Sequence, residues 1–230
     1  MAGSPGDRRT HGSAAGLGYR YAVPLARRLL PESLRLAVRA LVALPPRIAW
    51  FYVRAARCAR RHGDTGILMK SVRPEDLSAL LKAAGGRRHV VELGTGGGWS
   101  AIALLMAEPE RRVISYDPVP PPPRYLGLAD AQTRSRLTLR QRGAQAGPEA
   151  GDPPVELLFV DIQAHTKETT VQALTVWRGS LSPDALVALH DYGPDFPGVA
   201  EAVATLRLDG EVLGHTLFVC PGVAGSTVTR

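Results

Sequence analysis

Residues 90–100 read Val-Val-Glu-Leu-Gly-Thr-Gly-Gly-Gly-Trp-Ser, and this stretch decides the fold. Its apolar start predicts a strand over His89–Leu93, and the glycine-rich turn leads into a predicted helix over Trp99–Ala107. Glycines at alternate positions let the backbone take unusual dihedral angles and approach a ligand without a Cβ in the way. A helix that begins directly after the turn offers free N–H groups to polar ligand atoms. The stretch therefore predicts a ligand site between a strand and a helix.

The rest of the chain continues the alternation of strands and helices. Further strands are predicted at Arg112–Tyr116, Leu137–Gln141, Val155–Asp161, Leu186–His190 and His215–Val219, and helices at Arg73–Ala84, Tyr125–Ala131, Glu168–Leu181 and Val199–Leu206. This order predicts an α/β fold with a mostly parallel sheet of about seven strands. The almost wholly apolar strand that starts at Val155 fits a sheet covered on both faces.

The positive charge of the chain lies almost entirely at its N-terminal end. Residues 1–62 contain 12 Arg against Asp7 and Glu32, which gives +10, and the remaining residues give −3, so the two parts sum to the net charge of +7. The slightly acidic larger part argues against nucleic-acid binding. The basic part fits an acidic partner or a membrane surface.

The N-terminal part divides into two predicted segments. Residues 1–17 are rich in Gly, Ser and Arg and are expected to be disordered, and residues 18–64 form a basic helical appendage interrupted at Pro45-Pro46. A basic helix carrying Trp50 and Phe51 can lie on a membrane interface. Alternatively, its apolar face covers the larger domain or a second subunit of a homo-oligomer. The sequence leaves both interpretations open.

Several features favour a cytoplasmic protein. The first residues lack the apolar segment of a secretory signal, and the apolar stretch Leu41–Val53 is interrupted and shorter than the ~20 residues that a spanning helix needs. Cys58 and Cys220 lie far apart, lack metal-ligand spacing and fit a reducing compartment.

The spacing of the glycines distinguishes between two classes of cofactor. A dinucleotide-binding fingerprint places a third glycine where this chain has Trp99. The pattern Glu92-x-Gly94-x-Gly96-x-Gly98 instead resembles motif I of class I S-adenosylmethionine-dependent methyltransferases. The resemblance implies a Rossmann-like, doubly wound domain over residues 65–230. It also implies that the glycines pass under the methionine part of S-adenosylmethionine and that Glu92 helps to hold its amino end. A nicotinamide oxidoreductase is the disfavoured alternative.

Asp117 provides a second anchor for the cofactor. It ends the second strand 23 residues after Gly94, close to the ~20-residue separation at which an acidic side chain reaches ribose hydroxyls. Many members of this methyltransferase class carry an acidic residue just after the third strand, where it accepts from the adenine amino group. This chain has no carboxylate there, so the resemblance implies that backbone groups of Gly143 and Ala144, or the Gln145 amide, serve the adenine. The predicted cofactor-binding residues are Glu92, Gly94, Thr95, Gly96, Gly98, Trp99, Ser100, Asp117, Gly143, Ala144 and Asp161.

Two later strands end in polar clusters, Asp161 to Glu168 and His190-Asp191. These segments are similar to a methyltransferase subfamily of sugar and antibiotic O-methylation. The resemblance implies Asp161 and Asp191 as ligands of a divalent metal such as Mg²⁺, and His165, Asp191 and His190 as catalytic residues. Ile162 stands where glycine is usual, and His190 where the metal-dependent members have an acidic residue. Structural roles for both histidines therefore remain open.

The prediction is an O-methyltransferase that acts on a hydroxyl of a small molecule of the sugar or natural-product type. The alternative is a non-catalytic domain of the same fold whose basic helices bind a membrane surface or a partner.

Overall fold

The computed structural model describes residues 31–222, so the tail predicted at 1–17 lies outside the described residues. The strands are β1 (His89–Leu93), β2 (Arg112–Tyr116), β3 (Leu137–Arg140), β4 (Val155–Val160), β5 (Leu181–Leu189), β6 (Glu211–Leu213) and β7 (Leu217–Pro221). The helices are α2 (Glu32–Ala43), α3 (Pro46–Arg61), α4 (Thr65–Lys70), α5 (Pro74–Ala83), α6 (Trp99–Ala107), α7 (Pro123–Leu126), α8 (Ala131–Arg134), α9 (Lys167–Trp177) and α10 (Pro197–Leu206). Two short 3₁₀ helices are η1 (Ala144–Ala146) and η2 (Arg178–Ser180).

The seven strands form one sheet in the order β3-β2-β1-β4-β5-β7-β6. The first five are parallel, and β7 runs antiparallel to both of its neighbours. The strand order reverses between β1 and β4, where Leu93 pairs with Val160 at the carboxyl ends. In an open α/β sheet this switch point is where ligands bind. The predicted fold class is confirmed.

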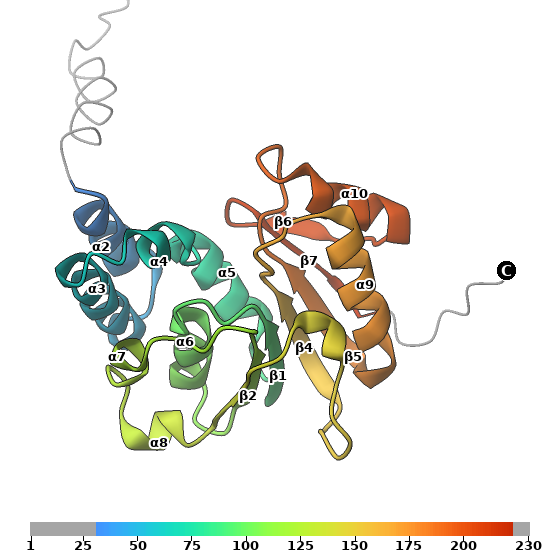
Figure 1. Cartoon of the computed structure of the whole chain (residues 1–230), viewed down its shortest axis with the longest axis horizontal. Coiled ribbons are helices and arrows are strands. Elements are labelled where there is room, and N and C mark those ends of the chain that lie inside the picture. Colours follow the sequence, from blue (N-terminus) through green and yellow to red (C-terminus); the bar gives the residue numbers. More distant parts are fainter. Residues whose placement is uncertain (1–30, 223–230) are drawn as a thin grey trace, which may run out of the picture.

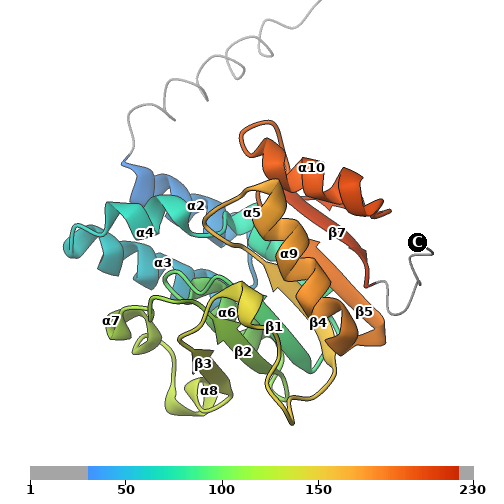
Figure 2. The same cartoon turned by 45° about the vertical axis from the view of Figure 1, so that its right-hand side comes forward.

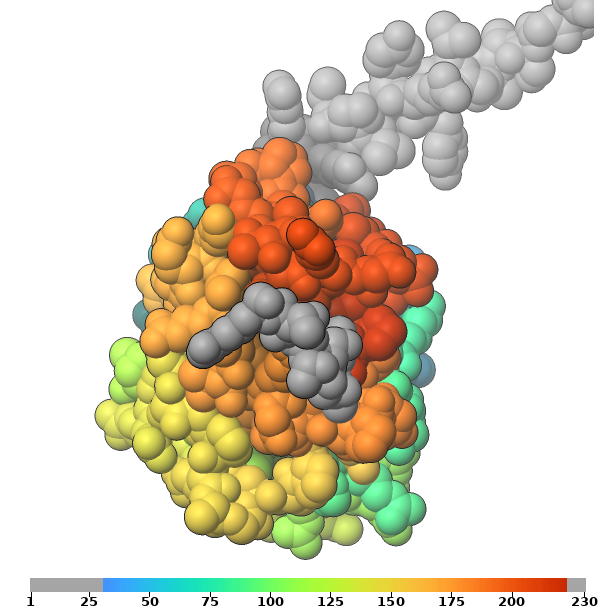
Figure 3. Space-filling view, turned by 90° about the vertical axis from the view of Figure 1, so that its right-hand side faces the viewer, coloured from blue at the N-terminus to red at the C-terminus, as the bar shows by residue number. Residues whose placement is uncertain are grey.

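Helices cover the sheet on both faces, as a largely parallel sheet requires. Helices α2, α3, α5 and α6 form the layer on one side, and α9 and α10 lie on the other (Figures 1 and 2). Viewed from the second side, the surface is built mainly from the second half of the chain, coloured yellow to red (Figure 3). The buried apolar residues accordingly form two clusters, one on each face of the sheet.

The N-terminal helices share a core with the sheet layer. Tyr52 of α3 packs edge-on against Trp99 at the start of α6, with ring centroids 5.1 Å apart, and its hydroxyl donates to the Val72 carbonyl over 2.8 Å. Arg39 of α2 forms a bidentate ion pair with Glu75 of α5. No helix among residues 31–222 is long and apolar enough to cross a membrane.

Some predicted boundaries were wrong. The helix expected over Glu168–Leu181 ends at Trp177, a 3₁₀ turn follows, and β5 begins at Leu181, because Gly179 and Pro183 favour a break that the apolar periodicity concealed. The helix expected over Tyr125–Ala131 is divided into α7 and α8. Helix α4 and strand β6 were not predicted.

The connection from β3 to β4 carries only the short η1, so part of one sheet face has no helix over it. A hollow of about 370 Å³ lies there, lined by residues that include Val91, Ile114 and Thr138 of β1, β2 and β3.

Candidate functional site

The glycine loop between β1 and α6 has the backbone geometry that the sequence indicates. Gly94 has a φ of 101°, and a Cβ there would collide with the backbone carbonyl of Asp161 at the end of β4. Gly98 has a φ of 75° and caps the N-terminus of α6. Gly96 has a φ of 50° and faces open space, because a Cβ placed on it would have no neighbouring atom within 4 Å. The loop therefore leaves room for a ligand in front of Gly96.

Asp117 holds this loop through its carboxylate. Its Oδ2 accepts from the N–H groups of Thr95 and Gly96 over 3.0 and 3.1 Å, and its Oδ1 accepts from the Val119 N–H over 2.8 Å. Asp117, the residue predicted to bind the ribose hydroxyls, therefore lies beside the glycine loop. In this arrangement it also fixes the loop conformation.

Glu92 lies beneath the loop and is fully buried. Its two carboxylate oxygens accept from the hydroxyls of Ser100 and Ser115, and the Ser115 hydroxyl lies 2.6 Å from that of Thr95. Burial raises the pKa of Glu92 to about 8; the two hydroxyls oppose this shift, and the charges of Asp161 and Asp117 add to it. Removal from water disfavours the charged form of a carboxyl group.

Two other predicted cofactor-binding residues, Trp99 and Ala144, make contacts within the protein itself. The Trp99 ring is buried between Tyr52 and Tyr125, with centroids 5.1 and 5.7 Å away. The Ala144 carbonyl accepts from the Trp177 indole N–H over 2.7 Å. From this buried position the Trp99 ring lies against the loop, because a Cβ placed on Gly97 would come within 3.0 Å of it.

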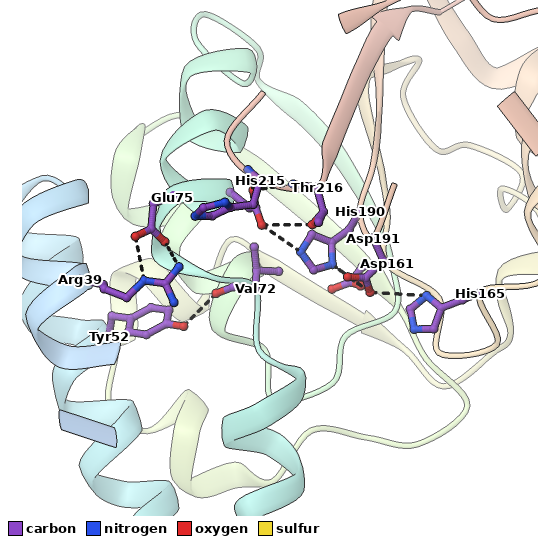
Figure 4. Close-up of polar contacts among 11 residues, drawn as sticks. Arg39, Tyr52, Val72, Glu75, Asp161, His165, His190, Asp191, His215 and Thr216 are labelled. Carbon is purple, nitrogen blue, oxygen red and sulfur yellow. Dashed lines mark hydrogen bonds and ion pairs between the residues drawn. The ribbon is translucent and has the colours of Figure 1, made fainter. Parts of the chain in front are cut away.

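A second cluster of side chains follows β4 and β5 (Figure 4). It begins at Asp161, whose backbone carbonyl lies against Gly94 of the glycine loop. His190 Nδ1 lies 3.1 Å from Asp161 Oδ1 and 3.3 Å from Asp191 Oδ2. His165 Nδ1 lies 3.5 Å from the same Asp191 oxygen. The four predicted residues are thus brought together, as expected for strands whose carboxyl ends meet in one crevice.

Two members of this cluster have a left-handed backbone. His165 has a φ of 44° and Asp191 a φ of 59°, a region that residues other than glycine seldom adopt. The His165 ring also packs against Phe196, with centroids 4.3 Å apart. Strained conformations of this kind persist where the surrounding structure holds them, and they concentrate at functional sites.

Asp76 completes the cluster, and sequence reasoning missed it. This fully buried residue of α5 has its Oδ2 3.7 Å from His190 Nε2, within ion-pair range but too long for a hydrogen bond. Its carboxylate also accepts from the N–H groups of His215 and Thr216. The sequence shows only an acidic residue in the first turn of a helix, where it reads as a favourable helix-end charge. Nothing local reveals its burial.

The three carboxylates determine the charge of His190. Burial lowers its pKa, but Asp161, Asp191 and Asp76 outweigh burial and raise the pKa well above 6.5. Burial likewise raises the pKa of Asp76, whereas His190 and the two backbone N–H groups bring it down to about 2. A charged imidazolium therefore neutralises part of the carboxylate cluster.

The same residues offer donor atoms for a metal. One atom each of Asp161, His190 and Asp191 lies within 4.8 Å of the others, close enough to share one ion. Mg²⁺ prefers oxygen donors, whereas an imidazole nitrogen suits softer divalent ions. A proton on His190 Nδ1 and a metal at that atom exclude each other, so the group fits a cation only when His190 is neutral.

Comparison with known proteins agrees with this geometry. Residues 91–192, from β1 to the end of the second cluster, match the profile of a family described as a methyltransferase domain. This segment of the chain is similar to a methyltransferase domain. The match agrees with the prediction of S-adenosylmethionine as cofactor that the spacing of Glu92 and the glycines gave. No curated protein matches the sequence.

Solved structures share the fold at low identity. The O-methyltransferase TomG from Streptomyces achromogenes, crystallised with S-adenosylmethionine, is 20% identical, with 74% of this chain and 89% of TomG covered at a TM-score of 0.52. CalS11, a TDP-rhamnose 3'-O-methyltransferase of calicheamicin biosynthesis, is 18% identical, with 92% and 96% covered at a TM-score of 0.53. An N1-methyltransferase from Burkholderia thailandensis is 18% identical, with 64% and 76% covered at a TM-score of 0.50. At these identities the likeness shows the fold alone.

Proposed function

We propose that the protein transfers the methyl group of S-adenosylmethionine to a hydroxyl of a small molecule of the sugar or natural-product type. The observation that carries the proposal is the His165–Asp191 pair, which lies beside the glycine loop at the switch point of the sheet. A hydroxyl acceptor benefits from a base. The fold alone does not distinguish oxygen from nitrogen acceptors, because TomG and CalS11 are O-methyltransferases and the Burkholderia protein is an N1-methyltransferase.

The reaction is an in-line displacement at the methyl carbon. The acceptor oxygen forms a bond to this carbon while the bond from carbon to the sulfonium sulfur breaks, and S-adenosylhomocysteine leaves. The hydroxyl proton passes to Asp191 or to His165, whose ring nitrogen is 3.5 Å from the Asp191 carboxylate. His190 and Asp76 act behind this pair as positioning residues. Beyond this, the protein orients the two reactants and excludes water, which are large effects in group transfer.

A divalent cation is a second element of the proposal. Asp161, Asp191 and neutral His190 would hold it, and such an ion would lower the pKa of a bound acceptor hydroxyl. A cytoplasmic location also belongs to the proposal, because Cys58 and Cys220 are both free. Nothing among the described residues favours the non-catalytic alternative.

The cofactor assignment is tested by Gly96→Val. A branched side chain fits poorly at a φ of 50° and would fill the open space in front of the loop, so calorimetry should show loss of S-adenosylhomocysteine binding. Gly86→Val is the matched control, because Gly86 has a φ of 73°, equally open surroundings and a position before β1, at the opposite end of the strand. Binding of NAD by the wild type without any S-adenosylhomocysteine signal would refute the assignment.

The catalytic assignment is tested by Asp191→Asn. The variant keeps the size of the side chain and removes its charge, so it should bind the cofactor normally and lose about 10²–10⁴-fold in turnover. Turnover is measured as release of S-adenosylhomocysteine with a panel of hydroxylated acceptors. Asp195→Asn, an exposed change in the same loop, should leave turnover unaffected. Inhibition by a chelator that Mg²⁺ or Mn²⁺ reverses would show that a metal takes part in the reaction. Equal activity with and without chelator would show that the His165–Asp191 pair acts without a metal.

A further inference from the structure

Helix α2 presents apolar side chains on two of its faces. Leu36 and Ala40 belong to the buried core that α2 shares with α3 and α5. A second set of aliphatic side chains is exposed: Leu34 by 46%, Val38 by 51%, Leu41 by 61% and Val42 by 84%. Their spacing of four, three and one residues places them on one stripe of the helix. An amphipathic helix that packs once on a core needs only one apolar face, so the second stripe indicates another contact.

Helix α3 presents an aromatic side chain among arginines on its outward face. Trp50 is 59% exposed, although this helix buries most of its other large apolar side chains. Arg47, Arg54 and Arg57 precede or follow it by three, four and seven residues, so they share its face of the helix. Helices α2 and α3 lie together along one side of the molecule, away from α9 and α10 (Figures 1 and 2). We call the stripe of α2 and the outward face of α3 the N-terminal surface.

The charge of this part of the chain indicates what the surface contacts. Residues 31–62 contain seven Arg and one Glu, a net +6, in a protein whose residues beyond 62 sum to −3. Arg57, Arg60 and Arg61 are exposed and form no ion pair with any residue in the part of the chain that the structure describes. The surface therefore combines protruding aliphatic side chains, one indole and unneutralised positive charge.

These properties distinguish between possible occupants. A second copy docked through the same surface would bring two sets of exposed arginines, Arg57, Arg60 and Arg61 of each copy, toward one another, which opposes association. None of the described helices is long and apolar enough to cross a membrane. A helix with an apolar stripe and arginines beside it matches the requirements for lying in the interface of a bilayer, with apolar side chains at the acyl boundary and cations at lipid phosphates.

We infer that the N-terminal surface docks the enzyme on an anionic lipid bilayer. The stripe from Leu34 to Val42 enters the interface together with Trp50, and Arg57, Arg60 and Arg61 contact the phosphates. This inference concerns a surface outside the catalytic cluster and does not depend on the identity of the acceptor.

The experiment is co-sedimentation of the full chain with vesicles at low salt. Vesicles of phosphatidylcholine with phosphatidylglycerol should retain the protein, and vesicles of phosphatidylcholine alone should not. Val42→Asp removes an exposed apolar group and adds a negative charge, so it should lower binding at least tenfold. Arg57→Gln, Arg60→Gln and Arg61→Gln combined should lower it more than tenfold, because each basic residue near such a surface contributes about fivefold.

Val212→Asp is the matched control, since Val212 is 47% exposed on β6, outside the proposed surface. It should bind vesicles like the wild type, and all variants should still bind S-adenosylhomocysteine, which separates loss of docking from loss of fold. Three results would overturn the inference: no binding of the wild type to anionic vesicles, equal loss in Val42→Asp and Val212→Asp, or a dimer that Val42→Asp dissociates while vesicle binding is absent.

Discussion

Asp76 shows how a single buried carboxylate organises a site from a distant part of the chain. It lies on α5, whereas the histidine it faces follows β5 and the N–H groups it accepts from precede β7. Gly214, with a φ of 68°, lets the chain before β7 approach it closely, because a Cβ at Gly214 would collide with the Asp76 carboxylate. Three segments therefore meet at one side chain. A role of this kind follows from tertiary contacts that the residue's own neighbourhood in the sequence does not show.

The Asp76→Asn variant tests this role. Because the pKa of Asp76 is lowered to about 2 in the folded protein, its charge stabilises the fold above its ordinary pKa of 3.8. That contribution is lost as the pH falls through about 2. The variant should therefore be less stable by about 2 kcal/mol at pH 6 to 7, and the difference from the wild type should disappear as the pH approaches 2. Urea unfolding over this pH range measures the difference.

A positioning role makes a further prediction for the same variant. Loss of the Asp76 charge should lower the pKa of His190, which NMR titration of the imidazole can follow, while affinity for S-adenosylhomocysteine changes little. The conservative variant Asp76→Glu keeps the charge and serves as the comparison. An unchanged His190 titration in Asp76→Asn would show that Asp161 and Asp191 alone determine its charge.

Among the elements, the strands and helices next to the glycine loop were predictable and the connections were not. The bounds of β1, α6 and β2 agree with the predicted ranges because each joins a short apolar run to a clear break, such as Gly94 or Asp117. Helix α9 was predicted too long, since Leu181 continues its apolar pattern although Gly179 ends the helix. Boundaries depend on such local competition between periodicity and breaking residues.

Part of the candidate site was likewise predictable from the sequence, and part was not. Sequence pattern and family resemblance brought together Asp161, His165 and Asp191, because parallel strands deliver their carboxyl ends to one crevice. The pattern could not show that the Trp99 ring packs into the aromatic contact between α3 and α6. Position next to a motif does not reveal which way a side chain points. The direction of the Trp99 ring depends on its contact with Tyr52 of α3, which lies almost fifty residues earlier in the sequence.

At the scale of the whole molecule, the buried network beneath the loop links global stability to pH. Glu92 is the fully buried centre of this network, and its pKa rises from 4.5 to about 8 on folding. Between these values the unfolded chain releases the proton first, so the folded state loses stability as the pH rises. The shift corresponds to at most about 5 kcal/mol, and relaxation of the surroundings reduces it. The loop is therefore held best, in the free protein, when Glu92 is protonated.

Glu92→Gln should remove this dependence, because glutamine keeps the shape and the hydrogen-bonding capacity but never ionises. We expect the free variant to gain stability over the wild type steadily from about pH 5 to pH 8, as measured by denaturant unfolding. Glu201→Gln, an exposed change on α10, should differ from the wild type by no more than about 0.5 kcal/mol at every pH. The opposite effect is expected for binding of S-adenosylmethionine. If Glu92 helps to hold the cationic amino end of the cofactor, the ionised carboxylate gains a partner that glutamine cannot replace, so the variant should bind the cofactor more weakly at pH 8. Equal cofactor affinity would restrict Glu92 to supporting the loop through Ser100 and Ser115.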